Sequence, residues 1–258
     1  MNLREFIHSA LWYTATAGIT ILITTLFYKG VETHARKASE TYVRKNLLYF
    51  IKAQEDELHI EHFGVPHVEF LPIEEIKHPS HFGEYEEENN TISFVESFAI
   101  TPKPTMVNFF IKLAYPSEIM YDLERATHHE LGHFYMDSLS EHLTGNNWPG
   151  FSTEITVREE ICLKVLAEGT AEYFERKMKD DTIKYYPVDH FLDFETMIKH
   201  QKKFFYEGGF QIVGPIIDAY GITGITYIIQ HTPKTIQELR TYQQKALEDL
   251  ALTEEIKP

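Results

Sequence analysis

The sequence predicts an α+β fold, in which a small mixed sheet precedes a largely helical C-terminal half and an N-terminal helix crosses a membrane. Residues 10–28 carry no charged side chain, short apolar runs interrupted by Pro and Gly fill residues 64–105, and the pattern after Pro116 is helical almost to the end. The chain has 258 residues, 43% of them hydrophobic, which is enough for one domain with an appendage.

The N-terminal segment over residues 10–28 would rise roughly 28 Å as a helix, about the thickness of the hydrocarbon core of a bilayer. Trp12, Tyr13 and Tyr28 lie near its ends, where aromatic residues favour the membrane interface. The alternatives are a cleaved signal peptide and a soluble or interfacial helix, and the lack of a small-residue cleavage site after the segment disfavours the first. We therefore predict a single-pass membrane anchor.

The residues after this segment set its orientation. Six basic and two acidic residues over positions 29–52 place the bulk of the chain in the cytoplasm by the positive-inside rule. The chain is accordingly divided into an anchor over residues 1–30, a juxtamembrane helix or linker over 31–60, and a globular domain over 61–258. The linker is predicted to be helical because apolar residues recur in it between charged ones.

The first part of the globular domain is predicted to be a small sheet. VEFLPI (68–73) and TISFVESFAI (91–100) have the composition of strands. The acidic run over residues 84–88 between them is interpreted as a solvated loop.

Helices follow the sheet. One begins after Pro116, and a second spans about 157–178. Between them, the Gly- and Asn-rich stretch over 138–155 is predicted to be a surface loop. Further on, Gly221 is placed to end a helix, and Thr235 begins a capping box for the last one.

Charge and cysteine content restrict the function. A net charge of −15 argues against nucleic-acid binding, which needs Lys and Arg to neutralise phosphates. The single cysteine, Cys162, excludes an intramolecular disulfide and any Cys-rich zinc or iron–sulfur site. A transition metal would therefore need nitrogen and oxygen ligands, and the 14 histidines are the first residues to consider.

The first of the predicted helices carries the motif His-Glu-x-x-His, formed by His129, Glu130 and His133. Two histidines one turn apart can direct their ring nitrogens to one ion, and the glutamate then lies near the open coordination position, where it can accept a proton from water. His128 has no partner at this spacing and is interpreted as structural. Asp137, one turn further, is either a support for a ligand or a solvated residue at the helix end.

A third ligand is needed because catalytic zinc usually has three protein ligands and a water. In the helix over 157–178, Glu168 and Glu172 stand one turn apart on an apolar face that also carries Glu175. Buried carboxylates are costly without a partner, and a metal with its histidine ligands would satisfy them. Gly169, inside a helix, costs about 1 kcal/mol and indicates close approach to another group.

These two motifs, HELGH (129–133) and EGTAEY (168–173), resemble those of the gluzincin zinc metallopeptidases, in particular the peptidase MA-like family, whose second motif is Glu-Gly-x-Ala-x-Tyr. The resemblance implies a zincin-like fold with two lobes, in which a small mixed sheet and an active-site helix are followed by a helical C-terminal lobe. GEYEEENNTISFV (83–95) resembles the edge strand that precedes the active-site helix in such proteins.

The resemblance also implies the roles of the site residues. His129, His133 and Glu168 would bind Zn²⁺, and Glu130 would be the general base that activates water for attack on a peptide bond. Glu172 matches the acidic position that hydrogen-bonds a ligating histidine, a contact that fixes the imidazole tautomer.

The predicted function is zinc-dependent hydrolysis of a peptide or protein substrate by a membrane-anchored, metalloendopeptidase-like enzyme. Tyr206 and His231 are both candidates for the donor that stabilises the oxyanion. One alternative is a catalytically inactive, zincin-like module that binds a peptide at the membrane. Another is a di-iron helical bundle, which requires a second Glu-x-x-His on a facing helix.

Overall fold

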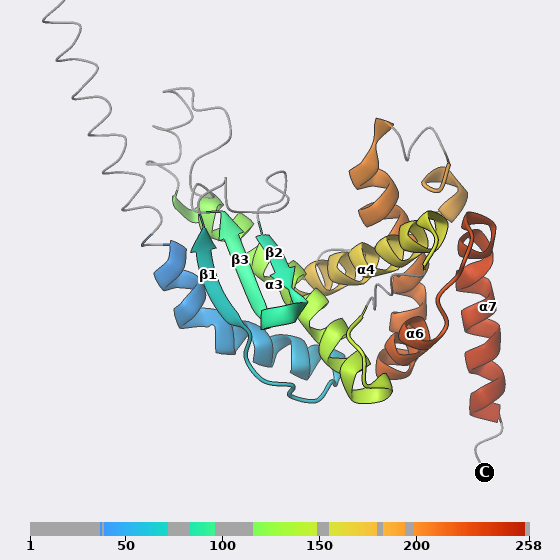
Figure 1. Cartoon of the computed structure of the whole chain (residues 1–258), viewed down its shortest axis with the longest axis horizontal. Helices are drawn as coiled ribbons and strands as arrows, with labels where there is room; N and C mark the ends of the chain where they lie inside the picture. The colour runs from blue at the N-terminus through green and yellow to red at the C-terminus, as the bar shows by residue number, and fades with distance from the viewer. Residues whose placement is uncertain are drawn as a thin grey trace, which may run out of the picture.

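The computed structural model describes residues 37, 39–71, 83–95, 116–148, 155–179, 183–193 and 199–255. Over these residues the chain is mostly helical with one small mixed sheet, in agreement with the α+β prediction (Figure 1). The sheet, the helix over residues 39–58 and α3 (Pro116–Thr144) form one side of the molecule. The helices α6 (Gly208–Gln230) and α7 (Ile236–Glu255) form the other, and α4 (Val157–Met178) lies between the two sides.

The sheet has three strands in the order β1-β3-β2. β1 (His67–Leu71) pairs in parallel with β3 (Thr91–Val95), and β2 (Gly83–Glu86) pairs antiparallel with β3. The strands predicted from the sequence are confirmed over their described residues. In β1 alternate side chains are buried, those of Val68 and Phe70, as expected for a strand with one face on the core. The central strand β3 is buried on both faces, at Thr91, Ile92, Ser93 and Phe94.

The acidic run over residues 84–88 is not the solvated loop that the sequence predicts. Its first part belongs to the edge strand β2, and Glu87–Asn89 forms a short 3-10 turn, η2, before β3. A strand forms here because its backbone pairs with β3 and because the ring of Tyr85 packs on Phe134 of α3, with 6.0 Å between centroids. These contacts outweigh the preference of glutamate for turns and solvent.

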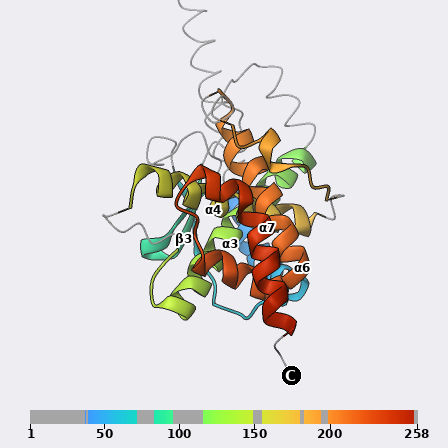
Figure 2. The same ribbon diagram turned by 90° about the vertical axis from the view of Figure 1, so that its right-hand side faces the viewer.

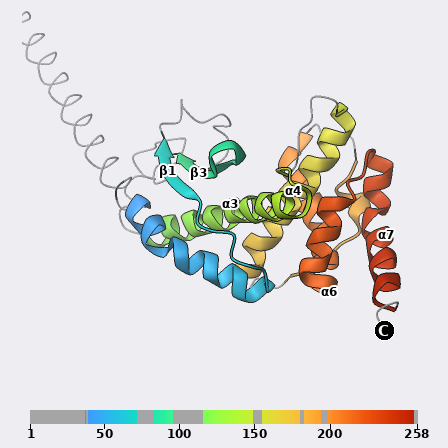
Figure 3. The same ribbon diagram turned by 60° about the horizontal axis from the view of Figure 1, so that its bottom comes forward.

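The central element is α3, whose middle turns are buried by neighbours on several sides (Figure 3). The helix over residues 39–58, predicted as part of the linker, packs along it. Gln54 Nε2 donates to the backbone oxygen of His128 at 3.0 Å, and the Tyr135 hydroxyl donates to that of Ile51 at 3.2 Å. Because α3 continues to Thr144, the first part of the predicted surface loop over 138–155 is helical instead.

The second predicted helix is confirmed in full as α4, from Val157 to Met178. A capping box fixes its start: Glu159 N donates to Thr156 Oγ1 at 3.3 Å, and Thr156 N donates to the Glu159 carboxylate at 2.9 Å. The helix α6 packs against α4, and α7 packs against α6 (Figure 2). Gly221 interrupts α6 with φ 52°, as the predicted helix end requires.

The last helix is capped nearly as predicted. Glu238 N donates to Thr235 Oγ1 at 3.1 Å, while the Glu238 carboxylate accepts from Lys234 N at 2.9 Å, one residue before the position of a strict capping box. The cap fixes where α7 begins against α6.

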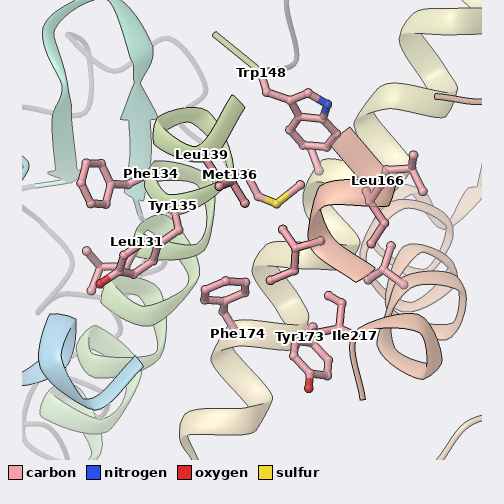
Figure 4. Packing of buried hydrophobic residues seen from close by; sticks show 14 of the residues in the cluster. Leu131, Phe134, Tyr135, Met136, Leu139, Trp148, Leu166, Tyr173, Phe174 and Ile217 are labelled. Atoms are coloured by element: carbon pink, nitrogen blue, oxygen red, sulfur yellow. The ribbon is translucent and has the colours of Figure 1, made fainter. Parts of the chain in front are cut away.

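Aromatic and aliphatic side chains fill the space between α3 and α4 (Figure 4). The rings of Tyr135 and Phe174 stack with 5.8 Å between centroids, and on the other side of α4 Tyr173 donates from its hydroxyl to Asp218 of α6 at 2.7 Å. This layer sets the distance between α3 and α4.

The predicted membrane anchor lies outside the described residues and stays a prediction. Within the described part of the chain, one stretch is long and apolar enough to cross a bilayer, Lys203–Gln230, with a mean hydropathy of 1.5. It is internal, and 56% of its most apolar window is buried, largely against α4 and α7. Such burial is typical of a core helix of a globular domain.

Candidate metal centre

The structure brings His129, His133 and Glu168 together at the crossing of α3 and α4. One nitrogen from each imidazole and one carboxylate oxygen lie within 4.8 Å of one another. Glu168 Oε2 is 3.3 Å from His129 Nε2 and 3.6 Å from His133 Nε2. His129 and Glu168 are buried, and His133 is partly exposed. This is a nitrogen and oxygen donor set with one accessible side, which suits a hydrolytic zinc ion.

Small residues allow α4 to approach α3 this closely. A Cβ atom on Gly132 would lie 2.8 Å from Ala171 Cα, so only glycine fits at this position of the motif. Gly169 marks a close approach, as the sequence predicts, and its neighbour is Gly209 of α6: a Cβ on Gly169 would lie 2.2 Å from the Gly209 carbonyl carbon. The three helices therefore pack with backbones in contact around the site.

The charges at the site are tightly coupled. Burial alone would raise the pKa of Glu168, but the adjacent imidazoles of His129 and His133 hold it well below its ordinary value. Burial alone would lower the pKa of His129, yet contacts with Glu168 and Glu175 raise it well above its ordinary value. A buried carboxylate thus needs a cationic partner, and a divalent ion can take this role as the imidazole loses its proton.

Glu130 lies beside this cluster on the wall of a cavity of about 480 Å³. It is buried, and burial raises its pKa, although His129 and His133 oppose the shift. The backbone N–H of Tyr85 in β2 hydrogen-bonds its carboxylate. Gly83 of the same strand would place a Cβ only 3.0 Å from Glu130 Cγ. The edge strand therefore fixes the position of the carboxylate.

The carboxylate that lies against His129 on its other side is Glu175, which the sequence interpretation did not assign. Glu175 Oε2 is 3.6 Å from His129 Nδ1, and its other oxygen forms an ion pair with Arg125. The predicted residue, Glu172, instead accepts a hydrogen bond of 2.7 Å from Arg176, although it lies within the same group of acidic side chains. The sequence signal for Glu175 was its position on the same apolar helix face as Glu168.

Of the two candidate oxyanion donors, the structure brings Tyr206 to the site. Its ring stacks on His129 with 5.3 Å between centroids and 16° between planes. It lies in a π-helical turn, η5 (Lys203–Glu207), of the kind often found at functional sites. Burial, with the nearby Glu168, raises the pKa of its hydroxyl, so this group keeps its proton at neutral pH.

His231 lies elsewhere. It caps the opposite end of α6 from Tyr206, where its ring stacks on Tyr227 with 4.1 Å between centroids. It does not line the cavity beside Glu130.

Two neighbours of the motif are structural. His128 is buried against Phe50 and bonded to Gln54 at 3.1 Å, as predicted, and burial lowers its pKa to about 4. Asp137 is buried, so neither a solvated position nor support of a ligand describes it. It accepts hydrogen bonds from the Tyr85 hydroxyl at 3.0 Å and from Trp148 N at 2.9 Å, which tie β2 to α3.

The single cysteine also has a structural environment. Cys162 is buried in α4, and burial raises the pKa of its thiol to about 12. A thiol that keeps its proton is a poor metal ligand and nucleophile.

No family model, no curated protein and no solved structure matches this chain. The resemblance to gluzincins thus stands on the two motifs, and the site is interpreted from its own geometry. This geometry disfavours the di-iron alternative, which requires a Glu-x-x-His motif on the facing helix. The facing helix is α4, which presents Glu168, Glu172 and Glu175 to the motif and contains no histidine.

Proposed function

We propose that the protein is a zinc-dependent peptide hydrolase with a zincin-like, two-lobed arrangement. The observation that supports it most strongly is the convergence of His129, His133 and Glu168 at one point, with Glu130 beside them in an open cavity. The edge strand β2 against α3 and the helical half beyond α4 are compatible with the two lobes of such enzymes.

The donor set fits zinc. Two imidazole nitrogens and one carboxylate oxygen are typical ligands of hydrolytic zinc, and the contact of His129 Nδ1 with Glu175 leaves Nε2 for the metal. When bound, zinc supplies a Lewis acid that polarises the scissile carbonyl and lowers the pKa of water.

The protein's own groups then handle the protons. Glu130, oriented by the Tyr85 N–H, accepts a proton from the attacking water and delivers it to the leaving amine. Tyr206, which keeps its proton, donates a hydrogen bond to the developing oxyanion. Glu175 and Arg125 hold His129 in a fixed orientation and tautomer.

We also propose that the segment over residues 10–28 anchors the domain to a membrane by one span, with the catalytic domain in the cytoplasm. The uncharged stretch and the basic residues that follow it support this. Membrane fractionation of the full chain, followed by protease protection of sealed vesicles, tests it. Recovery in the soluble fraction, or protection of the globular domain from protease on sealed inside-out vesicles, whose outer face is the cytoplasmic one, would contradict it.

The zinc assignment is tested by metal analysis of the full-length protein in mild detergent. We expect about one zinc per chain in the wild type and almost none in Glu168→Ala. Stoichiometric iron, or no metal after gentle purification, would contradict the assignment.

The catalytic assignment is tested by a diverse peptide library, with Glu130→Gln as the matched variant. This variant should keep zinc and the fold while hydrolysis falls at least about 10²-fold. If the two proteins cleave the library equally, Glu130 is not the base. If wild type binds zinc and peptides but cleaves none, the inactive peptide-binding module is the correct function.

A further inference from the structure

The cavity beside Glu130 contains an unusual arrangement of charge. One wall carries His129, Glu130 and Tyr206, and the rest is largely formed by ionisable side chains: Arg125, Glu172, Glu175, Lys202, Lys203 and Glu207. A volume of about 480 Å³ is enough for two or three amino-acid side chains. These charges decide which part of a peptide can bind next to the metal centre.

Three acidic side chains of the cavity already have arginine partners. Glu175 forms an ion pair with Arg125, and both Glu172 and Glu207 bind Arg176. Each of these carboxylates therefore has a guanidinium partner from the protein itself. A cationic substrate group would have to displace an arginine, which makes the cavity a poor site for Lys or Arg side chains.

The lysines of the cavity are different. Lys202 Nζ lies 5.9 Å from the centre of the Tyr206 ring, and Lys203 Nζ lies 5.6 Å from the centre of the Phe191 ring. Both are exposed, and within the described part of the chain neither forms a salt bridge. The Tyr206 ring stacks in turn on His129. Lys202 therefore stands one aromatic ring away from the metal centre, and Lys203 is its neighbour on the cavity wall. Among the described residues, neither ammonium group forms an ion pair with a carboxylate.

We propose that this cavity is a subsite for a carboxylate of the peptide substrate, which Lys202 and Lys203 hold close to the scissile bond. The inference rests on the proposed peptidase function and names its substrate class. The carboxylate comes either from an Asp or Glu side chain or from the C-terminus of the peptide. The first source makes the enzyme an endopeptidase that prefers acidic sequences, and the second makes it a carboxypeptidase.

The first experiment compares cleavage of matched peptides by the zinc-loaded full chain. The set places Glu, Gln or Lys at each position around a cleavage site from the library, and each peptide is made with a free and with an amidated C-terminus. We expect kcat/KM to be about tenfold higher for a carboxylate than for its amide at one position, and lowest for Lys. Loss of the preference in high salt is expected for partly exposed charges.

The second experiment reverses the charges. In Lys202→Glu/Lys203→Glu the preference for a carboxylate should disappear or shift to Lys peptides, measured as the ratios of kcat/KM among the Glu, Gln and Lys peptides on the same variant. Lys164→Glu is the matched control, because Lys164 also lies over an aromatic ring of η5, 5.2 Å from the centre of Phe205, but does not line the cavity. It should keep the wild-type preference.

Binding gives a readout that does not depend on turnover. Fluorescence anisotropy of the Glu and Gln peptides on Glu130→Gln should show the same tenfold preference, and the double Lys variant should abolish it. Equal binding and cleavage of Glu and Gln peptides would overturn the subsite, and so would an unchanged preference in the double variant. Selective binding of carboxylate peptides without any cleavage would uphold the subsite and refute the peptidase function.

Discussion

The contact between Gly169 and Gly209 gives the sharpest test of how the site is assembled. Alanine at position 169 would place its Cβ 2.2 Å from the Gly209 carbonyl carbon, whereas ordinary contacts begin near 3.4 Å. Because both partners are backbone, no side chain can move aside, and α4 and α6 must separate by about 1 Å. Such overpacking costs about 1–3 kcal/mol, while the helix preference of Ala over Gly returns about 1 kcal/mol.

An overlap of backbone with backbone falls at the upper end of this range, so the net effect of Gly169→Ala is a loss of about 2 kcal/mol of stability, or roughly 4–8 °C in Tm for a domain of this size. Because Tyr206 precedes Gly209 by less than one turn, the same displacement moves its ring relative to His129. A shift of about 1 Å at a catalytic group can lower the rate roughly 10²-fold. Thermal unfolding with and without EDTA measures the change in Tm, and peptide cleavage measures the change in rate.

Gly208→Ala is the matched control. A Cβ there would meet the side chains of Leu192 and Phe191 at 3.0 and 3.2 Å, which can shift, so the stability change should stay below about 1 kcal/mol. A Gly169→Ala protein as stable and active as wild type, or a Gly208→Ala protein that loses as much stability as Gly169→Ala, would show that this backbone contact does not assemble the site.

Three further predictions concern single side chains. Glu175→Gln should weaken zinc binding about 10–100-fold in competition with a fluorescent chelator, and more than Glu172→Gln does; the reverse order would restore the assignment made from the sequence. Tyr206→Phe should lower kcat about 10²-fold with zinc content and KM nearly unchanged. His231→Ala should leave kcat, KM and zinc content unchanged. Burial lowers the pKa of His128 to about 4, below the value near 6.5 in the unfolded chain, so the unfolded chain binds more protons as the pH falls. The EDTA-treated protein should therefore lose about 3 kcal/mol of stability between pH 6.5 and 4. In His128→Gln the free energy of unfolding should change less over that range.

The ligands could be predicted from the sequence because their geometry is local. A spacing of four residues brings His129 and His133 to one side of any α-helix, whatever surrounds it. The prediction of Glu168 is less local, since its role depends on how a second helix packs. A carboxylate and a glycine on an apolar helix face nevertheless indicated that this face contacts another group. The structure supplies that partner at 3.3 Å from His129 Nε2.

Local spacing alone could not show whether Glu172 or Glu175 contacts His129. The answer depends on the relative direction of α3 and α4. Glu172 lies about 40° from Glu168 around the helix axis, while Glu175 lies about 20° away on the other side and two turns along. Arg125, one turn before His129, also contacts Glu175, so α3 and α4 run in opposite directions. The antiparallel crossing brings the more distant carboxylate to the histidine.

The composition of the edge strand favours a loop, and only the resemblance of residues 83–95 to the edge strand of gluzincins indicated a strand there. Four glutamates in the run over residues 84–88 favour a loop, and only the pairing with β3 and the packing of Tyr85 on α3 make it a strand. The hydrogen bond from the Tyr85 hydroxyl to the buried Asp137 completes this attachment. The pairing with β3 is a local hairpin, but the two contacts of Tyr85 with α3 join residues far apart in the sequence. Because Tyr85 also orients Glu130, the position of the proposed base depends on tertiary structure.

The position of Tyr206 depends on tertiary structure for the same reason. Within the aromatic and glycine sequence FFYEGGF its hydroxyl has no partner that spacing would reveal. The π-helical turn shifts the helical phase before Gly208, and the close approach of Gly209 to α4 then sets the Tyr206 ring over His129. This backbone contact, one of many between α6 and α4, thus positions the proposed oxyanion donor. A substitution that loosens this contact must change stability and catalysis together, whereas Tyr206→Phe changes catalysis alone.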